Sequence, residues 1–268
     1  MRFVRKTILT NGQGISYLDN EIQSKTTILF VHGNSLNNNS FKNQFNDKDL
    51  NKYRLVAIDL PGHGESEWNK DYSIPQMTTD IATFCNQLRL INFIIVGHSL
   101  GGHLIIQSLS KLKSCKGALL IGTPPVKRPL NIDIAFMPHP VIPLLFKAEL
   151  TAEELELFAE SVCAPQNKKY VIKSITVTDP KFREKMMTSI MQGDLKDEIL
   201  ILEKIKTPVA LVYGENDELV NKKYVRSLNL SNLFEQNPIF IKNSWHASHM
   251  SNSNIFNKVM KECVLEFN

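Results

Sequence analysis

The sequence contains little cysteine and no CxxC pair. Its four cysteines are spread along the chain, at Cys85, Cys115, Cys163 and Cys263. Because a close pair is typical of zinc sites and of thiol redox centres, neither kind of site is expected. Buried free thiols are typical of proteins in a reducing compartment, so we expect a cytoplasmic protein without disulfides.

Long apolar runs and dense basic clusters are missing as well. Apolar runs such as Ile28–Val31 and Phe93–Val96 have the length of strands and are far too short to span a membrane. Charges interrupt the first residues, and no apolar stretch of a secretory signal follows them. The net charge of +4 is spread along the chain, which disfavours nucleic-acid binding. We therefore expect neither a membrane nor a nucleic-acid partner, and the sequence leaves the oligomeric state open.

Short β-branched runs alternate with segments of helical periodicity over most of the chain. Strands are expected at residues 3–9, 15–18, 27–31, 55–59, 93–97, 117–121, 209–213 and 239–242, and helices at 77–90, 100–112 and 254–267. This alternation predicts an α/β fold with a mostly parallel, twisted sheet flanked by helices. The first two runs flank Asn11-Gly12 and predict a hairpin at the edge of the sheet.

The alternation stops between residues 123 and 207. Six of the twelve prolines fall between Pro124 and Pro143. Helical patterns follow at 151–162, where Thr151 and Glu154 form a capping-box motif, and at 181–191. We interpret residues 124–207 as a helical cap inserted into one core, which residues 1–123 and 208–268 form. A separate second domain is the alternative.

The pattern Gly97-His98-Ser99-Leu100-Gly101-Gly102 joins an expected strand to an expected helix. This is the context of a nucleophile elbow, in which a strained turn lifts a serine hydroxyl above the sheet at the positive end of a helix. Small neighbours are needed at Gly97 and Gly101 because the turn is sharp. We predict that Ser99 is a nucleophile; an inert serine in a glycine-rich turn is the alternative.

A second loop, His32-Gly33-Asn34-Ser35, follows the expected strand at 27–31. An oxyanion hole needs two N–H groups aimed at one point, and we assign them to Leu100 and Asn34. The Asn34 side chain is also a candidate substrate contact, unless it only satisfies backbone groups of its loop. His32 is expected to brace the loop, and the polar run at residues 37–39 is expected to be solvated.

An acid and a base are expected downstream of the nucleophile, in that order. The expected strand at 209–213 ends in a turn with three carboxylates, of which Asp217 is predicted to be the acid and Glu215 and Glu218 are alternatives. His246, between the last expected strand and helix, is the predicted base, with His249 as the alternative. No further ligand cluster completes a metal site with these histidines, so no metal or cofactor is predicted.

These motifs together resemble the α/β-hydrolase superfamily over nearly the whole chain. The resemblance rests on the Asn34 loop, the stretch Asp59–Ser66, the Ser99 elbow, the turn Gly214–Asp217 and the His246 loop. It implies an α/β-hydrolase fold that hydrolyses a small-molecule ester or lactone through an acyl-enzyme. The Asp59–Ser66 stretch is usually structural in that superfamily.

A narrower resemblance is to the metal-independent N-acyl homoserine lactone lactonases of this fold. It rests on the first loop, the elbow up to His103, and Gly122-Thr123-Pro124-Pro125-Val126. These lactonases can carry glutamate where this chain has Asp217, and a cap tyrosine where it has Phe158. The resemblance implies a lactonase with Phe158 near the substrate. A general carboxylesterase, a carbon–carbon bond hydrolase and a ligand receptor with slow turnover are the alternatives.

The position of the acid can be tested by comparing Asp217→Asn with Glu215→Gln and Glu218→Gln. An amide in place of the acid favours the wrong histidine tautomer, so only the true acid should cost several orders of magnitude in kcat. We expect that loss for Asp217→Asn alone, measured as hydrolysis of p-nitrophenyl butyrate. An active Asp217→Asn beside an inactive Glu218→Gln would assign the role to Glu218.

Overall fold

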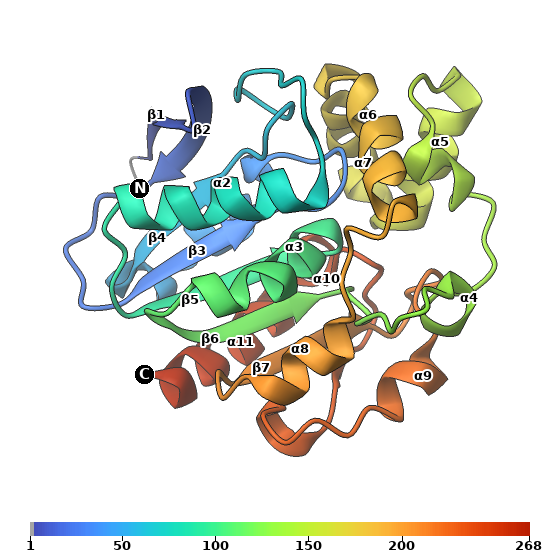
Figure 1. Cartoon of the computed structure of the whole chain (residues 1–268). Coiled ribbons are helices and arrows are strands. Elements are labelled where there is room, and N and C mark those ends of the chain that lie inside the picture. Colours follow the sequence, from blue (N-terminus) through green and yellow to red (C-terminus); the bar gives the residue numbers. More distant parts are fainter. Residues whose placement is uncertain (1–2) are drawn as a thin grey trace.

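An eight-stranded sheet forms the centre of the computed structural model, which describes residues 3–268 (Figure 1). The strand order is β1-β2-β4-β3-β5-β6-β7-β8. The hairpin of β1 and β2 is antiparallel to its neighbour β4, and the pairs from β4 to β8 are parallel. The strands are β1 (Val4–Thr10), β2 (Gln13–Asp19), β3 (Thr27–Val31), β4 (Arg54–Ile58), β5 (Phe93–His98), β6 (Cys115–Ile121), β7 (Val209–Gly214) and β8 (Ile239–Ile241). The predicted sheet and edge hairpin are confirmed.

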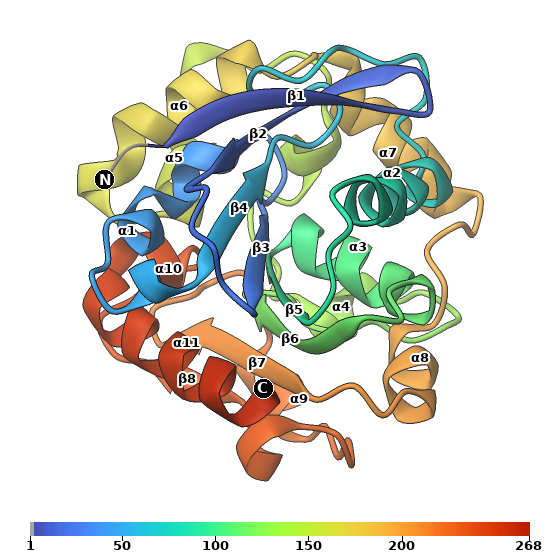
Figure 2. The same cartoon turned by 90° about the vertical axis from the view of Figure 1, so that its left-hand side faces the viewer.

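Two apolar cores lie on the two faces of the sheet. Successive side chains of a strand point to opposite faces, so Leu29 and Val31 of β3 pack in one core while Ile28 and Phe30 pack in the other. One face is covered by α2 (Ile74–Gln87), α3 (Leu100–Ser108) and α8 (Glu198–Lys204), and the other by α1 (Lys42–Phe45), α10 (Ser248–Ser251) and α11 (Ser253–Phe267) (Figure 2). Burial on both faces explains why the strands are apolar without alternation.

Helix α2 begins three residues earlier than its apolar spacing predicts. The Ser73 side chain accepts a hydrogen bond from the Gln76 N–H at 3.3 Å, and Pro75 occupies the first turn. A capping serine and an early proline set the start of a helix, whereas spacing counted from Met77 detects only its apolar face. Helix α3 in turn ends before its prediction, in a 3₁₀ turn at Leu109–Lys111.

Most of the segment between β6 and β7 forms a helical cap beyond the carboxyl ends of the strands (Figure 1). It contains α4 (Ile132–Ala135), α5 (Ala152–Val162), α6 (Lys168–Val177) and α7 (Lys181–Met191). The predicted capping box at the start of α5 is formed, and α6 was not predicted. The helix α8, which ends this segment, packs against α3. The boundaries at residues 124 and 207 remain a prediction.

The polar run Asn37-Asn38-Asn39 is not the solvated loop that its composition suggests. Asn38 is fully buried, and its N–H donates to Asp59 Oδ1 at 2.7 Å. The Asn37 side chain caps a 3₁₀ helix at Asn38–Phe41. The prediction was wrong because composition does not show that the Asn38 N–H pairs with the buried carboxylate of Asp59.

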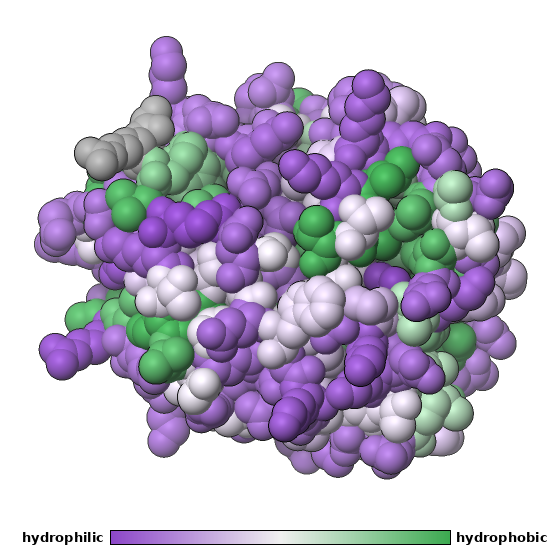
Figure 3. Space-filling view, turned by 90° about the horizontal axis from the view of Figure 1, so that it is seen from above, coloured by the Kyte–Doolittle hydropathy of each residue, from purple (hydrophilic) through white to green (hydrophobic). Residues whose placement is uncertain are grey.

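The remaining elements are short. They are α9 (Lys222–Arg226) and the 3₁₀ helices at Leu50–Lys52, Pro143–Phe146, Pro165–Asn167 and Phe234–Gln236. All four cysteines are free and buried, as predicted, and burial raises the pKa of each thiol to about 12. Within residues 3–268 no helix combines the length and the apolar character needed to cross a membrane. Seen from above, the surface is mostly polar, with separate apolar patches (Figure 3).

Candidate active site

Four loops at the carboxyl ends of β3, β5, β7 and β8 hold the predicted site residues. Asn34 follows β3, Ser99 follows β5, Asp217 follows β7 and His246 follows β8. Because neighbouring parallel strands end at the same edge of the sheet, these loops meet although they are far apart in the sequence.

Ser99 occupies a strained turn between β5 and α3. Its φ of 51° and ψ of −117° lie in a region of backbone conformation that residues other than glycine rarely adopt. The Ser99 N–H donates to Ile121 O at 2.8 Å. A Cβ atom at Gly97 would lie 2.7 Å from Gly102 N, and one at Gly101 would lie 2.4 Å from Val31 O. Both positions therefore require glycine, as the elbow pattern predicted.

Asp217 and His246 form a buried hydrogen-bonded pair. His246 Nδ1 lies 2.9 Å from Asp217 Oδ2, and both side chains are almost fully buried. The other carboxylate oxygen accepts hydrogen bonds from the N–H groups of Leu219, at 2.9 Å, and Val220, at 3.3 Å. The carboxylate is fixed from both sides and holds the imidazole by Nδ1, which leaves Nε2 as the nitrogen for a substrate or nucleophile.

The alternatives to this pair lie elsewhere. Glu215 and Glu218, the other carboxylates of the turn, are exposed. The ring of His249 stacks on Phe41, with 4.8 Å between ring centroids. It makes no hydrogen bond to Asp217 or to any other group in the part of the chain that the structure describes.

The turn that carries Asp217 touches the His246 loop backbone to backbone. Asn216 N–H donates to Ser244 O at 2.8 Å, and a Cβ atom on Gly214 would lie 2.2 Å from that same oxygen. Only glycine permits this approach. Gly214 is thus part of the site, although sequence reasoning used it only as the start of a turn.

The N–H groups of Asn34 and Leu100 make no hydrogen bond within residues 3–268. Leu100 is the first residue of α3, where an N–H has no partner inside the helix. The Asn34 side chain is engaged: its Nδ2 donates to Leu145 O at 2.8 Å, and its Oδ1 accepts from Ser35 Oγ at 2.8 Å. It therefore ties its loop to the cap, and the two backbone N–H groups are free for a ligand.

Arg183 of α7 extends this network, and sequence reasoning missed it. The guanidinium donates to Ser35 Oγ at 2.9 Å and to the carbonyl oxygens of Lys147 and Ala148. The side chain is buried and pairs with no carboxylate within the described chain. Its only signal in the sequence is a lone arginine on the predicted helix 181–191.

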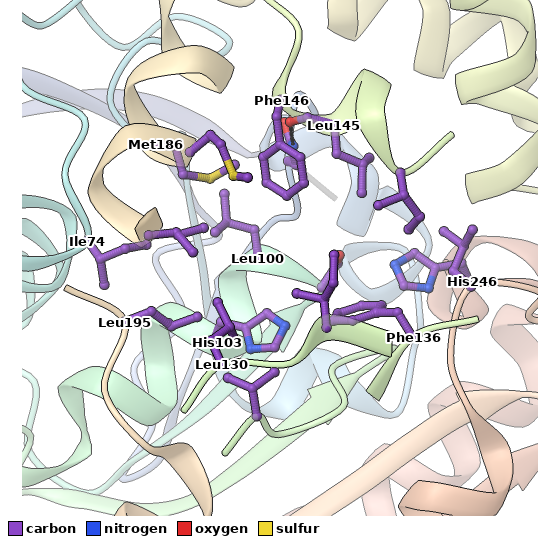
Figure 4. A pocket seen from close by; sticks show the side chains of 18 of the residues that line it. Ile74, Leu100, His103, Leu130, Phe136, Leu145, Phe146, Met186, Leu195 and His246 are labelled. Carbon is purple, nitrogen blue, oxygen red and sulfur yellow. Dashed lines mark hydrogen bonds between the residues drawn. The ribbon is translucent and has the colours of Figure 1, made fainter. Parts of the chain in front are cut away.

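A cavity of about 460 Å³ lies between the cap and the sheet and reaches Ser99 and His246. Apolar side chains make up most of its wall, as Figure 4 shows for Ile74, Leu130, Phe146 and Met186. Of the apolar residues in this segment, Phe136, Phe146 and Phe158 line the cavity, whereas Met137 and Leu155 do not. Met137 is exposed, and Leu155 packs inside the cap.

Two further buried histidines lie close to His246, and one of them, His98, also lines the cavity. The ring centroids of His98 and His249 are 4.9 Å apart, and neither ring nitrogen of His249 has a hydrogen-bond partner among residues 3–268. Burial lowers the pKa of His249 to about 3, with a further contribution from His246, and lowers the pKa of His98 well below its usual value. Within residues 3–268 no group of three or more potential ligands could hold a metal ion.

Comparison with known proteins agrees with this geometry. Residues 26–253 match the family described as alpha/beta hydrolase fold. The chain belongs to the α/β-hydrolase family. Among curated relatives of this hydrolase, the AB hydrolase superfamily protein YisY of Bacillus subtilis is 25% identical over 221 residues, which cover 75% of this chain and 78% of YisY. The pimeloyl-acyl-carrier-protein methyl ester esterase of Wigglesworthia glossinidia brevipalpis is 24% identical and covers 90% of this chain and 94% of its own.

Solved structures place the hydrolase near one lactonase in fold. A mutant of the N-acyl homoserine lactonase AidH, in complex with N-hexanoyl homoserine, superimposes with a TM-score of 0.94. The match covers 100% of this chain and 98% of AidH at 24% sequence identity. The family therefore rests on the match of residues 26–253, and the likeness to AidH shows a shared fold.

The hydrolase should lose stability in mild acid because His249 is buried uncharged. Its pKa is about 3 in the folded state and about 6.5 in an unfolded chain, so the unfolded state binds the proton first as the pH falls. The contribution of the uncharged His249 to the free energy of unfolding is therefore present above pH ~6.5 and is lost as the pH falls from there towards 3. Replacing His249 with Phe should reduce the loss between pH 7 and pH 4.5 by about 2 kcal/mol. Urea unfolding at the two pH values measures this, and an unchanged pH dependence in the variant would contradict it.

Arg183→Met should destabilise the hydrolase because it removes the donor to the buried Ser35 Oγ and to the part-buried carbonyl oxygens of Lys147 and Ala148. We expect the free energy of unfolding to fall by about 3 kcal/mol. Arg183→Lys should lose less, since an ammonium group still reaches some of the acceptors but cannot form the planar fork. Equilibrium denaturation of the three proteins measures this. Equal stability of Arg183→Met and wild type would show that the network contributes nothing.

Proposed function

We propose that this hydrolase cleaves carboxylic esters through a Ser99 acyl-enzyme and opens the lactone ring of N-acyl homoserine lactones. The buried pair of Asp217 and His246, 2.9 Å apart at the wall of the cavity that contains Ser99, carries the proposal. The likeness in fold to a mutant of AidH in complex with N-hexanoyl homoserine lactone supports the lactone. So do the motifs shared with metal-independent lactonases.

In the proposed reaction Ser99 Oγ attacks the lactone carbonyl carbon while His246 Nε2 takes its proton. Asp217 keeps the other nitrogen, Nδ1, protonated and stabilises the imidazolium. The negative charge on the carbonyl oxygen is accepted by the free N–H groups of Asn34 and Leu100. The imidazolium then protonates the ring oxygen as the C–O bond breaks, which leaves Ser99 acylated.

Water completes the cycle. Its proton goes to His246 and its oxygen attacks the acyl carbon, which releases Ser99 and the ring-opened acid. The leaving alkoxide of a lactone stays tethered to the acyl group, so reclosure competes with water at this step. A cap formed by residues 124–207, with Phe158 in its wall, would hold the acyl chain while water attacks. The phenyl ring of Phe158 gives the lactone no hydrogen bond.

Ser99→Ala should lower kcat for N-hexanoyl homoserine lactone on the order of 10³-fold or more. Ring opening is followed by chromatography of N-hexanoyl homoserine, with Ser99→Ala at equal concentration as the blank because lactones also open in mild alkali. Longer acyl chains should improve kcat/KM by about fourfold per methylene, until the cavity is filled. A fluorophosphonate probe should label the wild type and not the variant.

Each alternative has its own result. Labelling that survives Ser99→Ala would remove Ser99 as the nucleophile. Cleavage of p-nitrophenyl butyrate, with lactone opening equal to the blank, would make the protein a carboxylesterase. Binding of one equivalent of lactone with almost no turnover would make it a receptor.

A further inference from the structure

The cavity contains a second histidine–carboxylate pair, which the proposed reaction does not use. His103 of α3 lines the cavity together with Ser99 and His246 (Figure 4). Its Nδ1 lies 2.8 Å from Glu198 Oε2 and 3.1 Å from Oε1. Glu198, at the start of α8, is fully buried and is not one of the residues that line the cavity.

The partners of Glu198 decide which nitrogen of His103 carries the proton. The carboxylate also accepts hydrogen bonds from Val126 N–H, at 3.0 Å, and from Gln107 Nε2, at 3.3 Å. Since its other contacts are donors, Glu198 acts as an acceptor and His103 Nδ1 donates to it. In the neutral ring Nε2 then has a free lone pair, and it has no partner within residues 3–268.

His103 lies in the first turn of α3, close to Ser99. Its N–H donates to Ser99 O at 3.2 Å, and both residues line the same cavity. Most side chains of the cavity wall are apolar, among them Phe136, whose ring centroid lies 6.2 Å from that of His103. A polar atom in such a wall costs free energy until it is paired, which favours a substrate that brings a donor to it.

We propose that His103 Nε2 accepts a hydrogen bond from the amide N–H of the substrate, and that Glu198 is the positioning residue that fixes its tautomer. The proposal rests on the proposed function and names the group that the site recognises. In an N-acyl homoserine lactone the amide nitrogen is attached to the carbon next to the scissile carbonyl. The amide N–H is the only hydrogen-bond donor of a simple N-acyl homoserine lactone, and Nε2 is an unpaired acceptor in the same cavity.

The test compares N-hexanoyl homoserine lactone with its carba analogue, in which a methylene group replaces the amide N–H. Each kcat/KM is divided by the rate constant for alkaline opening of the same lactone, which removes the difference in intrinsic reactivity. The wild type should prefer the amide by about tenfold, mainly through KM, as expected for the loss of one buried hydrogen bond. His103→Leu should treat the two lactones alike.

Two further variants separate recognition from structural support. Glu198→Gln keeps His103, but the new glutamine side chain can donate to His103 Nδ1 and so move the ring proton to Nε2. The preference for the amide substrate should therefore be lost in this variant too. Phe136→Leu changes the shape of the same wall without changing its polarity, and should affect both lactones equally. If His103→Leu fails to fold because Glu198 is left unpaired, His103→Leu/Glu198→Gln replaces it. The rate of fluorophosphonate labelling reports an intact elbow in every variant.

The outcomes distinguish this inference from the proposed function. If the wild type opens both lactones and His103→Leu keeps the preference for the amide, or if the wild type has none, the inference is wrong and the lactonase function stands. If the wild type opens neither lactone but cleaves p-nitrophenyl butyrate, the lactonase function is wrong and the inference falls with it.

Discussion

The hydrogen bond between Asp217 and His246 depends on how closely two loops of the chain approach each other. The two residues follow β7 and β8, adjacent strands at one side of the sheet, and the backbone of their loops meets at Gly214. A side chain at that position would separate the loops and with them the carboxylate and the imidazole. Because the pair is buried, its electrostatic interaction is stronger than it would be in water. The proposed chemistry at Ser99 therefore requires both this order of strands and the glycine at position 214.

The loop after β3 is held in a different way, by contacts with the cap and not with a neighbouring loop of the sheet. Asn34 is held by one carbonyl oxygen of the cap, Leu145 O, and Ser35 by the guanidinium of Arg183. The direction of the free Asn34 N–H therefore depends on the cap as well as on the sheet. Leu100 needs no such support, because its N–H is oriented by the start of α3. One of the two N–H groups is set by local helix geometry, and the other by packing across a segment interface.

The sequence was sufficient where a feature is local and insufficient where it depends on distant packing. Apolar runs located the strands, and the spacing of Gly97, Ser99 and Gly101 located the elbow, because steric limits act over a few residues. The short side chain of Asp217 favoured it over its neighbours, and the structure buries it alone among the three carboxylates. No local pattern could reveal that Arg183 contacts Ser35, 148 positions away, or that His103 contacts Glu198, 95 positions away. Such pairs arise only when helices of the cap and core pack together.

The apolar cluster inside the cap includes residues that do not belong to the cap. Leu219, two positions after Asp217, and Ala247, next to His246, pack among Phe158 and its neighbours, and Ala247 N–H donates to Val162 O at 2.9 Å. This arrangement constrains how the protein can evolve. Phe158, Val162 and Leu219 belong to this cluster and also line the cavity, so a substitution there changes the pocket and the support of the two loops together. Wall positions outside the cluster, such as Phe146 and Met186, can change for other acyl groups without that second effect.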